Sequence, residues 1–352
     1  MRKPICIAVV GALGAVGSEM LGIIESSTLP IKKIKPLDIA ANVGKSIVCR
    51  GERWFVEEAR KGIFTDVDIA LFSAGSQASE YLSPIAQKEG AIVVDNSSQW
   101  RMTDGVPLVI PEVNSQALQE HKGLIANPNC STIQMLVVLK PLHDLFKIKR
   151  VVVSTYQAVS GSGVAAIKEL RSQSEAFLQG EVTKPTTYPH PIAFNAIPQI
   201  DDFEENGYTK EEMKLVHETH KILDPHISVS PTAVRIPVFR GHSEALNIEF
   251  ANPYEREHVI SILSQAPGIE VVDNPALSHY PMALDAEGKN LVYVGRIRRD
   301  ATVENGLNLW VVSDNLRKGA ALNTVQIAEK LVDAMLLPDL LGTDYQWVSE
   351  WL

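Results

Sequence analysis

A glycine-punctuated turn near the start of the chain constrains its fold most. The apolar run CIAVVG ends at Gly11, and Gly14 and Gly17 follow before a segment whose apolar residues recur at helical spacing. Glycines at such a strand-to-helix turn allow a tight bend and the close approach of a pyrophosphate, which then lies at the helix N-terminus. The motif therefore predicts dinucleotide binding, with a tight turn that holds no ligand as the alternative.

The first 130 residues alternate short β-rich runs with helical segments over 16–27 and 76–90. This alternation is typical of a parallel sheet covered by helices on both faces. We predict an α/β Rossmann-like dinucleotide-binding domain over residues 1–128. Its candidate strands are CIAVVG, IKPLDIAA, VDIALFSA, AIVVDNS, PLVIPEV and GLIANP.

The pattern changes after Cys130. The runs RVVVSTYQAVSGSG and ALNIEFA predict strands of a broader sheet, a proline-rich stretch over 184–200 predicts a long loop, and residues 209–223 predict a helix. We expect a second α+β substrate and dimerisation domain over 129–318. Residues 319–352 are assigned to the first domain, because they begin with an amphipathic helix whose apolar face contains Leu322, Val325, Ala328, Val332 and Met335.

Composition excludes several classes of function. With 352 residues the chain is long enough for two domains, and its formal net charge of -9 argues against nucleic-acid or membrane binding as its main task. No apolar run approaches the length of a membrane span. Cys6, Cys49 and Cys130 are widely spaced and odd in number, so we predict no metal site, no disulfide framework and a cytoplasmic location.

Cys130 is the first candidate for chemistry. It follows Asn-Pro-Asn at the point where the apolar run IQMLVVLKPL begins. A thiol at the start of a helix meets the positive end of the backbone dipole, which favours the thiolate. The alternative is that Cys130 is a small buried apolar residue.

Other polar residues stand at the ends of predicted strands or on one helix face. Arg101 follows a strand-like run, Gln157 ends a strand, and His242 lies in a run with Arg235. Each has a plain alternative as a solvated charge, a loop cap or a turn residue. Glu211 and Lys214 are three residues apart, so they share a helix face and could equally form a surface pair.

Taken together, the motifs resemble those of aspartate-β-semialdehyde dehydrogenases. The resemblance runs in order from residue 5 to about residue 330. It therefore covers nearly the whole chain and is far more specific than any single motif. The matching runs are GALGAVG, DNSSQWRM, PLVIPEVN, NPNCSTIQM, STYQAVSGSG, RIPVFRGHSEALNIEF, VGRIRRD and GLNLWVVSDNLRKGAALNTVQIAE.

The resemblance implies three catalytic residues. Cys130 matches the acyl-accepting thiolate, His242 the general acid and base, and Gln157 the residue that orients the acyl intermediate. An imidazole near its ordinary pKa could take a thiol proton and give one to an oxyanion.

The resemblance also implies how a substrate would bind. Arg235 matches the arginine that pairs with the substrate α-carboxylate, and Glu211 matches the acid that meets its amino group. An arginine fork suits a carboxylate, and two cations suit an acyl phosphate. The implied phosphate-binding residues are Arg101, Asn129 and Lys214.

The implied cofactor is NADP, with NAD or dual use left open. An acid about 20 residues beyond the glycine motif often binds the ribose of NAD. Asp38 is near that offset, but we expect it to lie too early in the predicted strand 34–41, and Lys45 could meet a ribose phosphate. The expected cofactor-binding residues are Gly11, Gly14, Val16, Gly17, Ala41, Asn42, Lys45, Ser160, Gly161 and Asn315.

The family reaction converts β-aspartyl phosphate to aspartate-β-semialdehyde through a thioester on the cysteine. It releases phosphate and serves lysine (by way of diaminopimelate), threonine and methionine synthesis. The resemblance also implies a homodimer, with cofactor and thiol meeting in a cleft between the domains. One alternative is another phosphorylating thiol-dependent reductase, such as N-acetyl-glutamyl-phosphate reductase or glyceraldehyde-3-phosphate dehydrogenase. The other alternative is a non-catalytic nucleotide-binding protein with the same fold.

Overall fold

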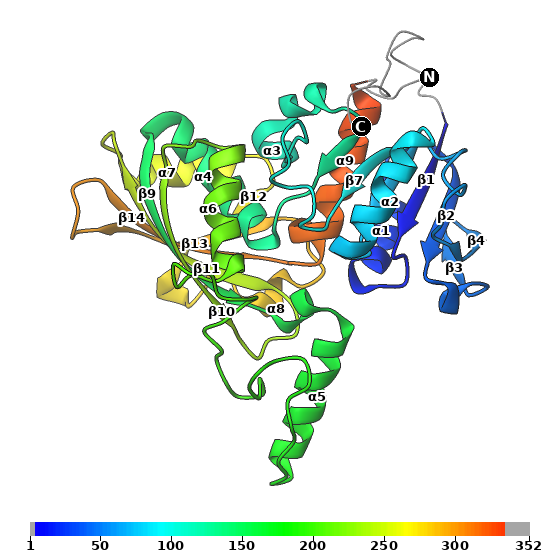
Figure 1. Ribbon diagram of the computed structural model, residues 1–352. Coiled ribbons are helices and arrows are strands. Elements are labelled where there is room, and N and C mark those ends of the chain that lie inside the picture. Colours follow the sequence, from blue (N-terminus) through cyan, green and yellow to red (C-terminus); the bar gives the residue numbers. More distant parts are fainter. Residues whose placement is uncertain (1–3, 335–352) are drawn as a thin grey trace. The chain divides into compact units, whose positions relative to one another are not determined.

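The computed structural model describes residues 4–334 and divides into two compact units (Figure 1). One unit contains Met1–Pro128 together with Ala320–Leu352, and the other contains Asn129–Gly319. Each unit has its own six-stranded sheet. Over the described residues no helix is both long and apolar enough to cross a membrane.

The sheet of the first unit is wholly parallel, with strand order β5-β2-β1-β6-β7-β8. Ile7 of the central strand pairs with Ile34 on one side and Ile69 on the other. This arrangement confirms the predicted Rossmann-like α/β fold. The strands are β1 (Ile5–Val10), β2 (Ile31–Asp38), β5 (Glu57–Glu58), β6 (Ile69–Phe72), β7 (Ile92–Asp95) and β8 (Leu124–Ala126).

Helices α1 (Ala15–Ser26) and α9 (Leu322–Asp333) share one apolar core with this sheet. Val325 and Ala328 of α9 are buried in this core, so the end of the described chain packs beside its beginning. Met335, which we place on the same helix face, lies outside the described residues. The other helical segments of the unit are α2 (Ser76–Lys88), α3 (Pro111–Asn114), η1 (Ala40–Asn42) and η2 (Ser115–Glu120).

The predicted strand PLVIPEV is wrong. Only Leu108 forms an isolated bridge, to Ala126, and the chain then enters the short helix α3 at Pro111. Proline favours the first position of a helix because its missing N–H needs no partner there. The Asn114 side chain closes this turn by accepting from Ile110 N at 2.9 Å and donating to Leu108 O at 2.9 Å.

The region after β1 differs from the prediction in a second way. Strand β2 ends at Asp38, three residues before the predicted end at Ala41. The next residues form an exposed single-turn helix and then a hairpin of β3 (Ser46–Cys49) and β4 (Glu52–Phe55), which the sequence analysis missed. Both residues of the hairpin turn have positive φ, as a two-residue hairpin loop requires.

The sheet of the second unit is mixed, with order β10-β9-β11-β14-β13-β12. Its inner pairs are antiparallel and its two outermost pairs are parallel. This sheet confirms the predicted α+β character of the second domain. The strands are β9 (Ile148–Gln157), β10 (Ser228–Arg235), β11 (His242–Phe250), β12 (Ile269–Val271), β13 (Val292–Asp300) and β14 (Gly306–Ser313).

Helix α4 (Cys130–Phe146) packs against one face of this sheet and beside α6 (Lys210–Ile222) (Figure 1). Most of its side chains are buried on all sides, which explains its nearly continuous apolar sequence. The stretch over 184–200 is irregular, as predicted. The remaining helices are α5 (Val164–Leu178), α7 (Arg256–Gln265), α8 (Ala283–Ala286), η3 (Val159–Ser162), η4 (Pro275–Leu277) and the π-helical η5 (Arg317–Ala321).

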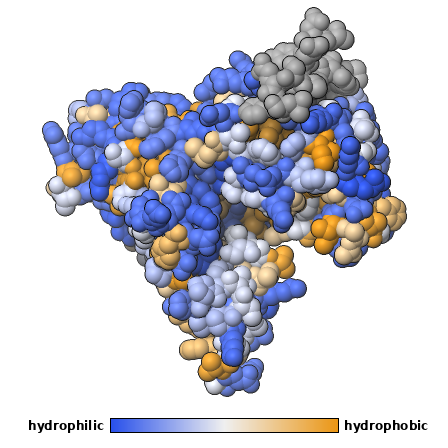
Figure 2. Space-filling model, viewed as in Figure 1, coloured by the Kyte–Doolittle hydropathy of each residue, from blue (hydrophilic) through white to orange (hydrophobic). Residues whose placement is uncertain are grey.

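Helix α5 projects away from the sheet of its unit, and the space-filling view shows apolar residues at its tip (Figures 1 and 2). Phe177 and Leu178 at the end of the helix are strongly exposed. The ring of Phe177 packs on that of Phe194, with centroids 4.7 Å apart. The projecting segment therefore carries an exposed aromatic pair.

Candidate active site

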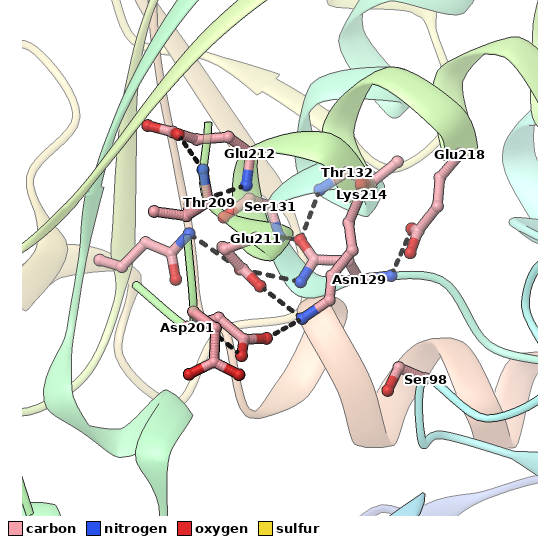
Figure 3. Close-up of polar contacts among 12 residues, drawn as sticks. Ser98, Asn129, Ser131, Thr132, Asp201, Thr209, Glu211, Glu212, Lys214 and Glu218 are labelled. Atoms are coloured by element: carbon pink, nitrogen blue, oxygen red, sulfur yellow. Dashed lines mark hydrogen bonds and ion pairs between the residues drawn. The ribbon is translucent and has the colours of Figure 1, made fainter. Parts of the chain in front are cut away.

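Helix α4 begins at Cys130, as predicted, and the residue before it caps the helix. Asn129 Oδ1 accepts hydrogen bonds from the backbone N–H groups of Ser131 at 3.0 Å and Thr132 at 3.3 Å (Figure 3). Cys130 is half-buried, whereas Cys6 and Cys49 are fully buried. The thiol therefore lies at the positive end of a capped helix, where a thiolate is favoured.

The carboxylate of Glu211 contacts three of the predicted residues, of which Figure 3 labels Asn129 and Lys214. Oε1 accepts from Asn129 Nδ2 at 2.9 Å and from Gln157 Nε2 at 3.1 Å, and Oε2 lies 3.0 Å from Lys214 Nζ. Burial opposes the ionised form, but the Lys214 charge and these hydrogen bonds outweigh it and lower the Glu211 pKa to about 2. Glu211 is therefore an ionised, buried carboxylate at neutral pH.

Lys214 is more than a solvated surface charge. Its Nζ lies between Glu211 and Asp201, whose Oδ2 is 2.9 Å away. Burial would lower the pKa of Lys214, but the charges and hydrogen bonds of these two carboxylates outweigh it and raise the pKa. An anion that binds here would meet a lysine that stays protonated.

Arg235 and His242 both hydrogen-bond to the main chain of Ala158, the residue that follows β9. The Ala158 N–H donates to His242 Nδ1 at 3.0 Å, and Arg235 Nη1 donates to Ala158 O at 2.7 Å. Ala158 directly follows Gln157, so this pair is contiguous with the Glu211 group. A Cβ added to Gly161 would lie 3.2 Å from Arg235 Nη1 and 3.5 Å from His242 Nε2, so the absence of a side chain leaves room there.

Two buried atoms of this pair, Arg235 Nε and His242 Nε2, have no hydrogen-bond partner within residues 4–334. Buried polar atoms without partners are rare, and a ligand that fills the site is one way to satisfy them. Because His242 Nδ1 accepts from a backbone N–H, the neutral ring carries its proton on Nε2.

The expectation that His242 titrates near its ordinary pKa is wrong. Burial, and next the nearby charge of Arg235, lower the pKa of His242 to about 3. The imidazole is therefore neutral at physiological pH and presents an N–H donor at Nε2.

Two residues predicted to bind cofactor, Ser160 and Asn315, hydrogen-bond to each other. Asn315 Nδ2 donates to Ser160 Oγ at 2.9 Å, and Asn315 Oδ1 accepts from Gly241 N at 2.9 Å. These contacts hold the turn that leads into His242. Their role toward a cofactor stays a prediction.

The glycine loop of the first unit has the predicted close packing. Gly11 has φ +80°, and an added Cβ would lie 2.6 Å from Ser73 O, while one at Gly17 would lie 2.1 Å from Gly11 O. Gly14 caps α1, and Val16 and Gly17 lie in the first turn of that helix. Larger residues would clash at this turn, as expected of a dinucleotide loop.

A cavity of about 690 Å³ opens at the carboxyl ends of β1, β2 and β6, beside this loop. Ligands in open parallel sheets bind at this edge, and the volume is in the range of ligand pockets. Gly11, Gly14 and Asp38 line it, together with Ser73 and Gln77, which the sequence analysis missed. The position of Ser73 directly after β6 could have indicated them.

Asp38 is the last residue of β2, so the expectation that it comes too early in the strand is wrong. Its Oδ2 accepts from Leu13 N at 3.0 Å and its Oδ1 from Asn42 Nδ2 at 2.8 Å. Lys45 and Ala41 lie in the exposed segment beyond it, and Lys45 Nζ donates to Asn42 Oδ1 at 2.6 Å. The acid, rather than the lysine, lines the cavity.

Arg101 belongs to the first unit and is buried, at 8% exposure. Its Nε donates to Asn127 O at 2.9 Å and its Nη2 to Asn96 O at 3.1 Å. The interpretation of Arg101 as a solvated charge is therefore excluded. Its part in phosphate binding stays a prediction.

Two residues near Cys130 escaped the sequence analysis. Glu218 Oε2 accepts from Asn129 N at 2.7 Å, and a Cβ on Gly319 would lie 2.8 Å from Cys130 Cβ. Glu218 follows Glu211 by seven residues and so shares its helix face, a spacing that could have indicated it. No comparable sequence signal points to Gly319, because its contact with Cys130 joins distant segments.

Family models match both halves of the chain. Residues 6–121 match the semialdehyde dehydrogenase NAD binding domain, and residues 139–318 match the semialdehyde dehydrogenase dimerisation domain. A nicotinamide dinucleotide cofactor is thereby supported.

Curated relatives agree with these models. The chain is 50% identical to the aspartate-semialdehyde dehydrogenase of Aquifex aeolicus, covering 94% of this chain and 99% of the relative. It is 49% identical to that of Bacillus subtilis, covering 94% and 98% respectively. A solved structure of aspartate semialdehyde dehydrogenase II from Vibrio cholerae, complexed with ASA, superposes with TM-score 0.92 at 46% identity over 94% of this chain and 99% of that one. These names favour the main prediction over the alternative reductases, and the chain belongs to the aspartate-semialdehyde dehydrogenase family.

Proposed function

We propose that this protein catalyses the nicotinamide-dependent reductive dephosphorylation of β-aspartyl phosphate to aspartate-β-semialdehyde. The observation that carries the proposal is the group of complementary side chains in the second unit. A thiol at a capped helix N-terminus, an ionised carboxylate, a protonated lysine, a buried arginine and a neutral imidazole are linked through shared contacts. One substrate with a carboxylate, an ammonium and an acyl phosphate would use all of them.

Cys130 is the proposed nucleophile. Its thiolate attacks the acyl carbon of β-aspartyl phosphate, a C–S bond forms, the C–O bond to phosphate breaks, and phosphate leaves as an anion. The resulting thioester accepts hydride more readily than a carboxylate, which splits one difficult reduction into two easier steps. The dinucleotide supplies the hydride when bound.

His242 and Gln157 are proposed to act on the acyl group. The neutral His242 ring has its proton on Nε2, so it can donate to the oxygen that becomes negative when the thiolate attacks. Gln157 Nε2 is held by Glu211 at 3.1 Å, which orients its amide beside Asn129. Of the predicted roles as acid and as base, this tautomer of His242 can therefore fill that of the acid.

Arg235 and Glu211 are proposed to bind the two ends of the amino acid. Arg235 Nε has no partner among the described residues, so a substrate α-carboxylate would satisfy a donor that is already buried. Glu211 stays ionised above a pH of about 2, so it can pair with an ammonium group. Neither the alternative N-acetylated substrate nor glyceraldehyde-3-phosphate offers such an ammonium.

Lys214, Asn129 and Arg101 are proposed to bind the phosphate. Lys214 remains protonated, and an incoming phosphate would compete with Asp201 for its ammonium group. Asn129 Oδ1 faces the helix N–H groups, so the amide N–H of this residue is the group that could reach an anion.

NADP is the proposed cofactor, following the resemblance, and NAD is the second candidate because of Asp38. An acid at the end of the second strand binds the ribose 2′-hydroxyl of NAD and would repel the phosphate of NADP. Asp38 occupies that strand end and lines the cavity. The ratio of kcat/KM values for the two nucleotides decides between them.

A homodimer is proposed through the second unit. On one face of β11 and β14, the residues Ala245, Asn247 and Trp310 are half-buried, while the other face packs on α4. Light scattering after size exclusion is expected to give twice the chain mass of 38.6 kDa. A cytoplasmic location is proposed as well, because all three cysteines are free.

The assay runs the reaction backwards. Purified protein with aspartate-β-semialdehyde and phosphate is expected to reduce NADP or NAD, with the rate followed by nucleotide absorbance and dependent on phosphate. N-acetyl-glutamate semialdehyde serves as the competing substrate. No reduction with either nucleotide, or a preference for the acetylated substrate, would contradict the proposal.

A further inference from the structure

A second buried carboxylate of α6, that of Glu218, contacts the main chain next to the proposed nucleophile. Its Oε2 accepts a hydrogen bond of 2.7 Å from the backbone N–H of Asn129, as the right side of Figure 3 shows. Glu218 is only 1% exposed. Glutamates are almost never buried so completely unless they are paired or hydrogen-bonded. The question is therefore what the hydrogen bond to Asn129 does for the protein.

Helix α6 holds Asn129 at two separate points. Glu211 accepts from the side-chain amide at 2.9 Å, and Glu218 accepts from the main-chain N–H at 2.7 Å. The two glutamates are seven residues apart, which places them on one face of α6 two turns apart. The side-chain oxygen of Asn129 meanwhile caps α4. Main chain and side chain of the residue before Cys130 are therefore both oriented by neighbouring groups.

The main-chain contact matters because the cap residue determines where the first side chain of α4 points. The N–H of a cap residue has no partner inside its own helix, and a buried N–H requires an acceptor. A carboxylate makes a shorter and stronger hydrogen bond than a neutral acceptor. In nucleophilic catalysis, a shift of about 1 Å can cost about 100-fold in rate.

We infer that Glu218 is a positioning residue for thioester formation, acting through the Asn129 main chain on the placement of Cys130 Sγ. The inference rests on the proposed function, in which Cys130 is the nucleophile. Glu218 has no proposed contact with the substrate, whose charged groups are assigned to Glu211, Lys214 and Arg235. Its loss is therefore expected to lower kcat and leave KM nearly unchanged.

Three variants separate the hydrogen bond from the charge. E218A removes the acceptor, E218D keeps the charge but withdraws it by one methylene, and E218Q keeps an acceptor oxygen without the charge. We expect kcat to fall about 100-fold in E218A and E218D, with KM for the semialdehyde little changed. E218Q is expected to recover most of the lost rate, since its oxygen still reaches Asn129 N.

The second measurement does not depend on turnover. The rate at which iodoacetamide alkylates Cys130, read by mass spectrometry across pH 6 to 9, reports the environment of the thiol. We expect E218A to slow this reaction several-fold at neutral pH, as Sγ leaves the helix N-terminus, and E218Q to restore it. If the wild type reduces no nucleotide with the semialdehyde, the proposed function fails, while the alkylation result still tests Glu218.

Glu212 provides a matched control on the same helix. It is buried too, but its carboxylate accepts from Thr209 N at 2.7 Å and Ala233 N at 2.9 Å instead of from Asn129. E212A is expected to lower Tm while kcat and the alkylation rate stay near those of the wild type.

Three results would overturn the inference. In the first, E218A keeps wild-type kcat and alkylation. In the second, E218Q is as impaired as E218A, which would assign the effect to charge. In the third, E212A loses kcat in proportion to its loss of Tm, which would assign the effect to helix stability.

Discussion

At the residue scale, the main chain of Gly319 leaves no room for a side chain beside the proposed nucleophile. A Cβ at Gly319 would lie 2.8 Å from Cys130 Cβ, so G319A must displace one of the two segments. We expect kcat to fall at least about tenfold while the protein remains folded, because a displaced thiol loses its attack geometry. G22A, in the interior of α1 with open space around it, is the matched control and is expected to keep full activity. Equal kcat values in both variants would contradict this account.

The three cysteines are expected to differ in reactivity. Burial raises the pKa of Cys6 and of Cys49 to about 11, so both stay protonated at neutral pH. Cys130 is half-buried at a helix N-terminus. We therefore expect iodoacetamide at pH 7 to label Cys130 first, with activity lost in step with that label, and C130S to be inactive. Full activity in a folded C130S would remove the covalent mechanism.

The residues of the candidate site could be predicted because they occur in long, ordered motifs, whereas their contacts could not. The motifs indicate Gln157, Glu211 and His242, but not the groups that these side chains contact. The His242 pKa was mispredicted, because burial and the Arg235 charge depend on packing between distant segments. Glu218 was missed because a glutamate on an amphipathic helix is ordinarily a solvent-exposed charge.

At the element scale, α6 carries three of the residues assigned above and begins with a capping box. The Thr209 hydroxyl accepts from Glu212 N at 3.3 Å, and the Glu212 side chain accepts from Thr209 N. T209A removes the first bond and is expected to lower the free energy of unfolding by about 1 kcal/mol, while T209S retains most of it. Urea unfolding of both variants measures the difference. A stability of T209A equal to that of the wild type would contradict the capping role.

Elements with a clear period were predicted, and those governed by local turn chemistry were not. Helices α1, α2 and α6 follow their apolar spacing, and the parallel strands follow their alternation with helices. PLVIPEV has the composition of a strand, but Pro111 and Asn114 make a helical turn there. The end of β2 was misplaced because apolar residues continue past Asp38 into the exposed segment.

At the scale of the whole molecule, we expect Glu244 to make stability depend on pH. It lies in β11 two residues after His242, is completely buried, and its carboxyl oxygens have no hydrogen-bond partner within the described chain. Burial raises its pKa well above the ordinary 4.5, more than the nearby Gln134 side chain lowers it. The folded protein therefore holds a proton that the unfolded chain releases once the pH passes about 4.5.

This difference in bound protons determines how the free energy of unfolding changes with pH. Because the folded state binds more protons, the free energy of unfolding falls as pH rises above the ordinary pKa, by at most about 1.4 kcal/mol per pH unit for one group. E244Q cannot ionise and keeps nearly the same shape. We expect it to be more stable than the wild type, with a gain that grows from pH 5 to pH 8. Urea unfolding at fixed protein concentration measures the gain, and E80Q, at an exposed position of α2, is the control expected to show none. A gain that does not change with pH would mean that Glu244 is not protonated in the folded protein, and that another group neutralises its charge.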